Sequence, residues 1–384
     1  MLYPRKEEKQ LDRELFRNPS SEYRGTPFWA WNCHVTKEQI ESQTEKLQQM
    51  GMGGAHIHCR TGMSIPYMSD EFMELVTYAH EKFAEKGMLT WLYDEDRWPS
   101  GFGGGLVTRY PEYRERYLIF SPEPIPDGFP EDRGRSISAA NVIRNDSRQL
   151  LMCYGVRLNP DGSMADYHAW KEGEEPPAGC ALSFRQEGQP DCASECGAEG
   201  YPGEEPEHRG CCPGCEPDGR QGCHQPWYAY LEVSGDSTWF NDQAYVNTLD
   251  PKAIAFFLEK VHNRYAEKLG ESFGKDIPSI FTDEPQFLHK SRLGKAGDRQ
   301  AQFIPYTDDF EESYQAVYGE SFLEHLPEVF WEMEGKPVSV ARYHYHDHIA
   351  ERFARAYADQ IGQWCQEHGL ALTGHMMEEP TLMS

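Results

Sequence analysis

Residues 88–105 read MLTWLYDEDRWPSGFGGG, an apolar run that leads directly into three acidic residues, an arginine and a glycine-rich turn. The run from Met88 to Tyr93 is short, apolar and bounded by turn-forming residues, which predicts a buried strand. Trp91 and Trp98 flank the three acids that follow. Carboxylates beside aromatic rings are typical of a sugar site, because the polar rim of a sugar takes hydrogen bonds and its apolar face stacks on a ring.

The same order, an apolar strand that ends in polar or aromatic residues, recurs along the chain. Strands are predicted at 27–31, 54–59, 88–93, 277–282 and 370–374, and helices at 37–50, 70–86, 251–269, 308–318 and 338–368. Strands that alternate with helices form parallel sheets with right-handed crossovers. A doubly wound sheet is the alternative, but the sequence has neither a G-x-G-x-x-G nor a P-loop motif to support it.

The predicted fold class is therefore α/β, a TIM-type (β/α) barrel whose site lies at the carboxyl ends of its strands. A closed barrel needs eight β/α units, and only about five are visible, so the barrel is expected to be incomplete. The alternation stops after the third strand, where short strand-like runs at 117–121, 150–158 and 227–233 surround a tract rich in Pro, Gly, Glu and Cys. We expect a β-rich insertion there, with a low-complexity centre.

The chain is expected to divide into three parts. Residues 1–112 would hold the first three β/α units, residues 113–246 the β-rich insertion, and residues 247–384 the fourth and fifth units, so that the chain ends before the barrel closes.

The charge balance excludes some classes of partner. The chain has 63 acidic and 37 basic residues, a formal net charge of −26. Nucleic acids and anionic membranes attract basic surfaces, so neither is expected as a partner. The charged N-terminus has no apolar signal region, and no apolar run is long enough to span a membrane. The predicted location is the cytoplasm, and the sequence predicts no oligomeric state.

Cysteine usage is uneven. Of 11 cysteines, seven fall between residues 180 and 223. Without an export signal, a disulfide framework is not expected. A zinc knuckle formed by Cys212 and Cys215 with Cys192 and Cys196 is an alternative, although the spacings are irregular.

Five groups of short motifs carry a resemblance to a known family. They are Phe16-Arg17-Asn18-Pro19 with Pro27-Phe28-Trp29-Ala30-Trp31-Asn32, Gly53-Gly54 with His56-Ile57-His58, the run Tyr93 to Gly101, the run Phe281 to Pro285, and Thr373-Gly374-His375 with Glu378-Glu379-Pro380. Together these resemble the glycoside hydrolase family 106 group, typified by α-L-rhamnosidases, everywhere except in the central insertion. The resemblance implies a TIM-barrel catalytic domain, cleavage of glycosidic bonds and a calcium ion near the sugar. The cysteine-rich tract and the absence of the later strands depart from the family pattern.

Glycoside hydrolysis needs one carboxyl group to protonate the leaving oxygen and a second that attacks the sugar or activates water. We predict Glu284 as the acid, with Asp283 raising its pKa by like-charge repulsion. The predicted partner is Glu378 or Glu379, of which only one should face the cleft because consecutive residues of an extended segment point opposite ways. The structural alternatives are a helix N-cap for Glu284 and a surface turn for the other two.

Further strand-end residues are predicted to bind the substrate. They are Trp31, Asn32, His56, His58, Arg60, Asp94, Glu95, Asp96, Trp98, Asp283 and His375. No metal ligand is predicted among them.

Each of these predictions has a structural alternative. Asp94 and Asp96 share a side of the extended chain, opposite Glu95, and the three acids could instead form a salt-bridge cluster with Arg97. His56 and His58 also share a side, where they could hold zinc with a third ligand or pack in the core. Core packing is expected for about half of the tryptophans near the strand ends, namely Trp29, Trp31, Trp91 and Trp98.

The sequence thus predicts a glycoside hydrolase, with rhamnoside specificity implied by the resemblance alone. One alternative is a non-catalytic carbohydrate-binding or truncated fragment, which the missing barrel units favour. The other is a metal-dependent hydrolase. The histidine-rich run 344–348 is expected to be a packed or solvated helix face, because only its first and last residues share a side of the helix.

Overall fold

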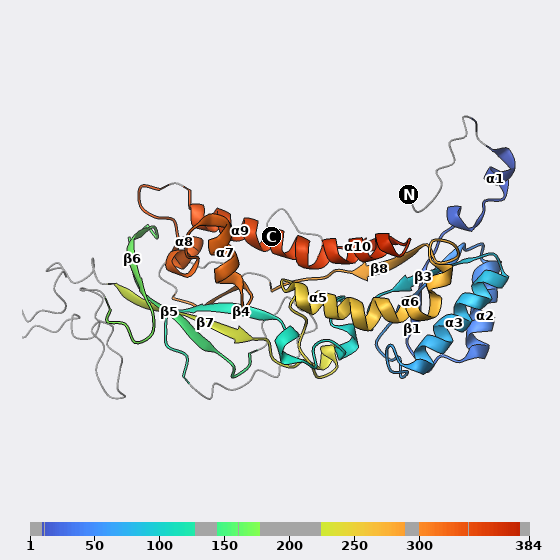
Figure 1. Ribbon diagram of the computed structural model, residues 1–384, viewed down its shortest axis with the longest axis horizontal. Helices are drawn as coiled ribbons and strands as arrows, with labels where there is room; N and C mark the ends of the chain where they lie inside the picture. Colours follow the sequence, from blue (N-terminus) through green and yellow to red (C-terminus); the bar gives the residue numbers. More distant parts are fainter. Residues whose placement is uncertain are drawn as a thin grey trace, which may run out of the picture.

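The computed structural model describes residues 10, 12–126, 144–159, 161–176, 224–288, 299–336 and 338–376 (Figure 1). These residues form a parallel sheet and an antiparallel sheet, each of five strands, with helices packed on both. In Figure 1 the antiparallel sheet lies to the left and the start of the parallel sheet to the right. The mixed α/β class is confirmed. Among the described residues, no helix combines the length and apolar character that a membrane crossing requires.

The parallel sheet contains all five strands that the strand–helix alternation predicted. They are β1 (Phe28–Trp31), β2 (Gly54–Cys59), β3 (Leu89–Tyr93), β8 (Ser279–Asp283) and β10 (Ala371–His375). They are hydrogen-bonded in this order, and every pair is parallel. A sequential order has no switch point, unlike a doubly wound sheet. In the described part of the chain β1 and β10 are free edges, so the sheet is open and a TIM barrel is not confirmed.

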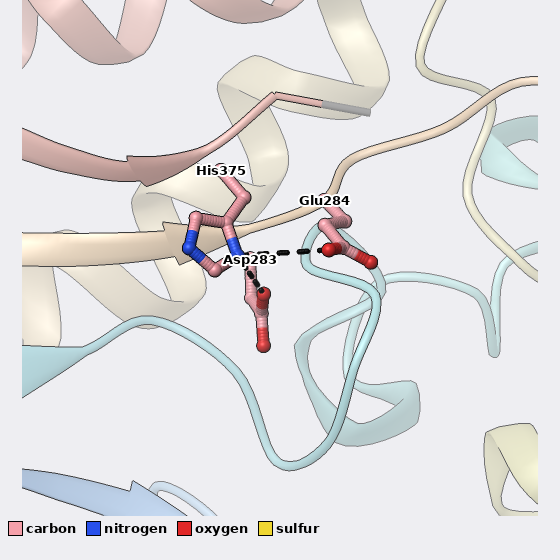
Figure 2. A group of neighbouring side chains, drawn as sticks. All are labelled: Asp283, Glu284 and His375. Carbon is pink, nitrogen blue, oxygen red and sulfur yellow. Dashed lines mark ion pairs between the residues drawn. The ribbon is translucent and has the colours of Figure 1, made fainter. Parts of the chain in front are cut away.

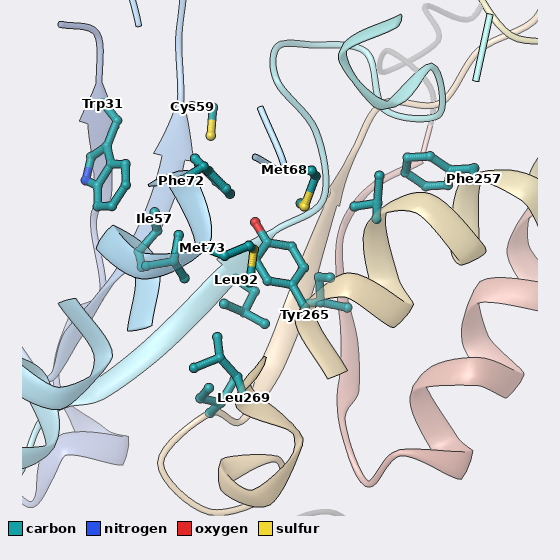
Figure 3. Close-up of a cluster of buried hydrophobic side chains, with 14 of the residues drawn as sticks. Trp31, Ile57, Cys59, Met68, Phe72, Met73, Leu92, Phe257, Tyr265 and Leu269 are labelled. Carbon is teal, nitrogen blue, oxygen red and sulfur yellow. The ribbon is translucent and has the colours of Figure 1, made fainter. Parts of the chain in front are cut away.

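Helices cover one face of this sheet. They are α2 (Lys37–Gln49), α3 (Asp70–Glu85), α5 (Pro251–Phe257) continued by η5 (Leu258–His262) and α6 (Asn263–Leu269), and the segments η8 (Ala354–Asp359) and α10 (Gln360–Glu367) that continue α9 (Val340–Phe353). Side chains such as Trp31, Ile57 and Leu92 point from the strands into the core beneath these helices (Figure 3). Both η5 and η8 are π-helical segments within longer helices.

The cap residues explain where the helices begin. Thr36 and Gln39 form a reciprocal capping box at the start of α2, and Ser69 caps α3 through the backbone N–H of Phe72. The shorter helices are α1 (Arg13–Arg17), η1 (Ser21–Tyr23), η2 (Gly103–Gly105), η3 (Pro111–Tyr113), η4 (Thr238–Phe240), η6 (Gly270–Ser272) and η7 (Leu323–His325).

The opposite face of the parallel sheet is concave. The ring centroids of Phe28 on β1 and Phe281 on β8 lie 5.1 Å apart, although β2 and β3 lie between these strands. In a flat sheet, three strand spacings would separate the two backbones by ~14 Å. The sheet therefore curves around this face, and side chains from distant strands meet there.

The antiparallel sheet joins two separate parts of the chain. Its order is β6-β5-β7-β4-β9, with β4 (Arg116–Ser121), β5 (Gln149–Leu158), β6 (Met164–Trp170), β7 (Gln225–Val233) and β9 (Gln302–Tyr306). The sequence predicted β4, β5 and β7 but not β6 or β9. The helices α7 (Phe310–Tyr318), α8 (Leu326–Phe330) and α9 share a core with this sheet.

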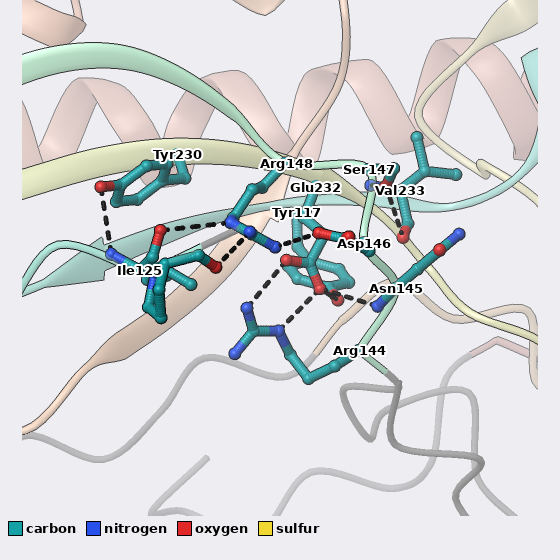
Figure 4. A network of polar contacts seen from close by, with 11 residues as sticks. Tyr117, Ile125, Arg144, Asn145, Asp146, Ser147, Arg148, Tyr230, Glu232 and Val233 are labelled. Atoms are coloured by element: carbon teal, nitrogen blue, oxygen red, sulfur yellow. Dashed lines mark hydrogen bonds and ion pairs between the residues drawn. The ribbon is translucent and has the colours of Figure 1, made fainter. Parts of the chain in front are cut away.

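The antiparallel sheet and the helices that share its core form what we call the antiparallel lobe. A buried carboxylate in this lobe binds several neighbouring segments (Figure 4). Glu232 on β7 has no exposed surface and accepts a 2.6 Å hydrogen bond from the Tyr117 hydroxyl. Arg144 donates to both Glu232 oxygens, at 2.7 and 2.9 Å, and the Asn145 N–H donates at 3.0 Å. The network attaches residues 144 and 145 to β7, because a buried carboxylate needs such partners.

Candidate active site

Asp283, Glu284 and His375 lie together at the carboxyl ends of β8 and β10 (Figure 2). The parallel register sets His375 opposite Asp283. The Nδ1 atom of His375 is 3.6 Å from Asp283 Oδ1 and 3.6 Å from Glu284 Oε1. The sequence analysis had selected all three residues, and the structure brings them into one group.

The backbone of Glu284 accounts for this grouping. Its φ of +44° is left-handed, which is uncommon for a residue with a side chain. Side chains alternate along a strand, so an extended Glu284 would point away from Asp283. The Glu284 N–H donates to the His375 carbonyl at 3.0 Å, which fixes the turn beside β10. As a result, both carboxylates lie beside the same imidazole.

Aromatic donors hold the two carboxylates. The Tyr93 hydroxyl donates to Asp283 Oδ2 at 2.8 Å, and the Trp98 indole N–H donates to Glu284 Oε2. Burial raises the pKa of Asp283, against the hydrogen bond from Tyr93 and the neighbouring His375 and Arg60, which lower it. The Glu284 side chain is 24% exposed and that of Asp283 is 12% exposed, so Glu284 is the more accessible acid.

A row of rings continues from this group across the concave face. His375 lies 5.3 Å from Phe281, which is 5.1 Å from Phe28. Phe28 also stacks on His58 at 4.5 Å, and His58 meets Tyr93 at 4.2 Å. Phe28 is 49% exposed, so the row of rings reaches solvent at this residue. Sequence reasoning missed Phe28, Tyr93 and Phe281, although strand alternation places Phe281 on the side of Asp283.

The two histidines of β2 lie on this concave face. Burial lowers the pKa of His58 to about 4, helped by the neighbouring Arg60 and His56. Burial also lowers the pKa of His56, whose Nδ1 is 3.1 Å from the Thr26 carbonyl. Both imidazoles are therefore neutral at pH 7, which suits hydrogen bonding rather than charge pairing.

Two of the three consecutive acids have structural partners. Glu95 accepts backbone N–H bonds from Asp96, Gly101, Gly103 and Gly104 at 2.8, 2.9, 2.7 and 2.6 Å. Burial raises the pKa of Glu95, and its backbone hydrogen bonds oppose the shift. Its carboxylate thus shapes the glycine-rich turn. Asp96 pairs with Arg97 at 2.9 Å and accepts from Asn241 at 3.0 Å. Only the Asp96–Arg97 pair matches the salt-bridge cluster named as the alternative, because Glu95 is bound by backbone N–H groups.

Asp94 and Trp31 lie behind the sheet, away from the concave face. Asp94 has no exposed surface, and Trp31, 1% exposed, belongs to the helix-side core. The expectation that these two bind substrate is corrected, because strand alternation turns both toward the helices. Trp29 shares this core, whereas Trp98 lies at Glu284 and Trp91 beside His56.

The remaining predicted site residues are either exposed at strand ends or lie outside the described residues. Asn32 and Arg60 are exposed and follow β1 and β2 directly. Glu378, Glu379 and the cysteines of residues 180–223 lie outside the described residues. In the histidine-rich run, His348 is buried against Ser313 at 2.9 Å and His344 contacts Glu320 at 3.0 Å, as expected for a packed helix face.

The Asp283–Glu284–His375 group can also be judged as a metal site. One ligand atom from each residue lies within 4.8 Å of the others. Calcium prefers sets of six or more oxygen atoms, and an imidazole is not among its usual ligands. Two carboxylates with one imidazole fit a first-row transition metal such as zinc or manganese better. The donor set therefore does not favour the calcium ion that the family resemblance implies.

Comparisons with known proteins give little further guidance. No protein-family model and no curated protein matches the chain. Among solved structures, a rhamnosidase from Novosphingobium sp. PP1Y is similar, with a TM-score of 0.48 and 13% sequence identity. The match covers 96% of this chain and 47% of that one, so this chain spans about half of its length. The likeness is too distant to show a family, and membership of glycoside hydrolase family 106 stays a prediction.

Proposed function

We propose that the chain is a glycoside hydrolase acting on a carbohydrate, with Glu284 as the proton donor. The observation that carries the proposal is the pair of carboxylates, Asp283 and Glu284, grouped with His375 at the edge of a concave aromatic face. Carboxylates supply the acid and the nucleophile or base of glycoside hydrolysis. Rings beside them suit the apolar face of a sugar.

The two oxygens of Glu284 have different surroundings. Oε2 accepts from Trp98, while Oε1 lies on the side of His375. This arrangement supports a carboxyl group that is held at one oxygen and passes its proton from the other. The second carboxyl group is Asp283 or, as predicted from sequence, Glu378 or Glu379. Rhamnoside specificity and a cytoplasmic location belong to the same proposal.

A panel of aryl glycosides that includes an α-L-rhamnoside tests the function. Glu284→Gln should lower kcat on the active substrate at least about 100-fold, the effect of losing a positioned general acid. Glu312→Gln, at an exposed glutamate on α7, serves as the matched control and should retain activity. Turnover by Glu284→Gln equal to wild type would remove the acid assignment. Proton NMR of the first-formed sugar anomer decides between retention and inversion.

A metal-dependent hydrolase is the second candidate, and the closeness of the three ligand atoms favours it. Here Asp283, Glu284 and His375 would hold a divalent cation that activates water. Elemental analysis of the purified protein, followed by assay after chelation and re-addition of zinc or manganese, separates the two candidates. Activity that persists fully after chelation supports the glycosidase with no bound metal. Activity that is lost and then restored by the metal, but not in His375→Ala, supports the second candidate.

A further inference from the structure

Ser100 joins the turn after β3 to the end of β8. Its backbone N–H donates to the Asp283 carbonyl at 2.8 Å, and its Oγ accepts from the Asp283 N–H at 2.8 Å. Ser100 has no exposed surface. Both backbone polar groups of Asp283 are therefore bound by one residue, which fixes the backbone from which the Asp283 and Glu284 side chains project.

The Ser100 hydroxyl needs an acceptor to keep this orientation. Its O–H donates to Asp94 Oδ1 at 2.6 Å, which leaves an oxygen lone pair free for the Asp283 N–H. Asp94 is fully buried. A hydroxyl without this acceptor could rotate, and its hydrogen would then compete with the N–H of Asp283.

The same turn also reaches Glu284. Trp98, two residues before Ser100, donates its indole N–H to the Glu284 carboxylate, and its carbonyl accepts from the Trp239 indole at 2.7 Å. The Tyr245 hydroxyl donates to the Ser100 carbonyl at 2.6 Å. The turn from Asp94 to Ser100 thus contacts both Asp283 and Glu284. Hydrogen bonds from Trp239 and Tyr245 hold this turn in place.

Both π-helical segments contribute a side chain to the layer behind this turn. His262, the last residue of η5, places Nε2 3.7 Å from Asp94 Oδ2. Tyr357, in η8, has its hydroxyl 2.8 Å from Thr282 Oγ1. π-Helical segments within α-helices occur frequently at functional sites. One segment therefore faces Asp94 directly, and the other reaches it through Thr282, whose side chain also bonds to Asp94.

We infer that Asp94 is a positioning residue, which acts through Ser100 to hold Asp283 and Glu284 in place for catalysis. Its catalytic part rests on the proposed function, whereas the positioning itself does not. The competing explanation is that Asp94 only supports the local fold. The two differ in what an asparagine does at this position, because Asn keeps an oxygen acceptor for Ser100 and loses the charge.

Amide hydrogen exchange at Asp283, followed by NMR, measures the positioning directly. Ser100→Ala and Asp94→Ala should each lower the protection of this amide by about tenfold, the loss of one hydrogen bond. Asp94→Asn should stay within about threefold of wild type. Thr90→Val is the matched control, because it removes another buried hydroxyl from β3, bound to His80 at 2.9 Å. It should leave the Asp283 amide unchanged.

Several outcomes would overturn the inference. Unchanged protection in Ser100→Ala would show that the link does not hold Asp283. Loss in Asp94→Asn as large as in Asp94→Ala would exclude the acceptor role, as would an equal loss in Thr90→Val. Should Asp94→Ala fail to fold, Ser100→Ala removes the same link with only one oxygen atom lost.

Steady-state kinetics, with a glycoside that the wild-type protein cleaves, test whether this positioning contributes to catalysis. Ser100→Ala and Asp94→Ala should lower kcat by about tenfold with KM nearly unchanged, and Asp94→Asn should restore kcat. Full kcat in Ser100→Ala despite lost amide protection would refute the catalytic part. If the wild-type chain cleaves no glycoside, the proposed function fails, while the exchange measurement still decides the positioning.

Discussion

At the residue scale, the site depends on one unusual backbone conformation. The left-handed φ of Glu284 reverses the alternation that would otherwise separate its carboxylate from that of Asp283. A non-glycine residue in this region costs about 1–3 kcal/mol, and such strain persists where surrounding contacts determine it. Here the contacts are the N–H bond to His375 and the indole of Trp98. Sequence reasoning placed both acids at a strand end, but it could not predict a φ value and hence the direction of Glu284.

The buried carboxyl group of Asp94 gives the stability of the protein a defined pH dependence. Burial raises the pKa of Asp94 to about 7, against hydrogen bonds from Ser100 and Thr282 that lower it. A raised folded-state pKa means that the folded protein binds the proton more tightly than the unfolded chain between the two pKa values. Its contribution to stability is therefore present at low pH and is lost as the pH rises toward 7. The facing His262 has a pKa lowered to about 3 by burial and stays neutral over this range.

Replacing Asp94 by Asn should therefore stabilise the protein at pH 8 and have little effect at pH 4. The gain at pH 8 is at most ~4 kcal/mol, from the linkage of the pKa shift to stability. Urea unfolding of both proteins across this pH range measures the difference. A difference independent of pH would contradict the burial of an ionisable Asp94, and a larger difference at pH 4 would reverse the predicted sign.

At the scale of elements, the sequence predicted the strands whose apolar runs are continuous and missed those that are not. β3 and β8 are runs of apolar or β-branched residues that end at acids, so their length and their ends could both be read. β6 mixes Asp, His and Ala, and β9 contains Pro305. Proline is tolerated there because β9 is an edge strand, paired only with β4. β4 is about 190 residues away in sequence. A local sequence pattern therefore cannot predict this pairing.

The contacts of the three consecutive acids could not be predicted from a local sequence pattern either. Strand alternation predicted that Glu95 points away from Asp94 and Asp96. It does not show that a glycine turn would wrap four backbone N–H groups around Glu95. Gly103 and Gly104, with φ of +61° and +60°, make this possible, since few other residues adopt such angles. The signal was the run of glycines directly after the acids, which indicates an anion held by backbone donors.

The Glu232 network should be a main determinant of the stability of the antiparallel lobe. Glu232→Gln removes the buried negative charge to which the Arg144 guanidinium, 15% exposed, donates two hydrogen bonds. Breaking a buried pair by removing one member costs about 3 kcal/mol or more. The control is Glu351→Gln, whose 58% exposed carboxylate pairs with the 76% exposed Arg355, and such a surface pair contributes about 0–1 kcal/mol. Denaturant unfolding should rank the variants in this order, and equal losses would contradict the burial argument.

At the scale of the whole molecule, the parallel sheet has one face covered by helices and one concave face that carries a partly exposed aromatic side chain. Phe28 lies at the edge strand β1, 49% exposed, in contact with rings from β2 and β8. A large aromatic side chain in such a row is suited to stack on a sugar bound at the acids. The curvature of the sheet is what brings β1 within reach of a site formed by β8 and β10.

Phe28→Ala should therefore weaken sugar binding with little loss of stability. Losing one stacking contact of about 1–1.5 kcal/mol corresponds to a roughly tenfold rise in Kd or KM. Tyr343→Ala provides the control, because this residue is 66% exposed on α9, a helix that carries none of the site residues. Titration calorimetry with the active sugar compares the two variants. An equal effect of both, or none at Phe28, would mean that the sugar does not occupy the concave face, and the acids at its edge would then need another substrate.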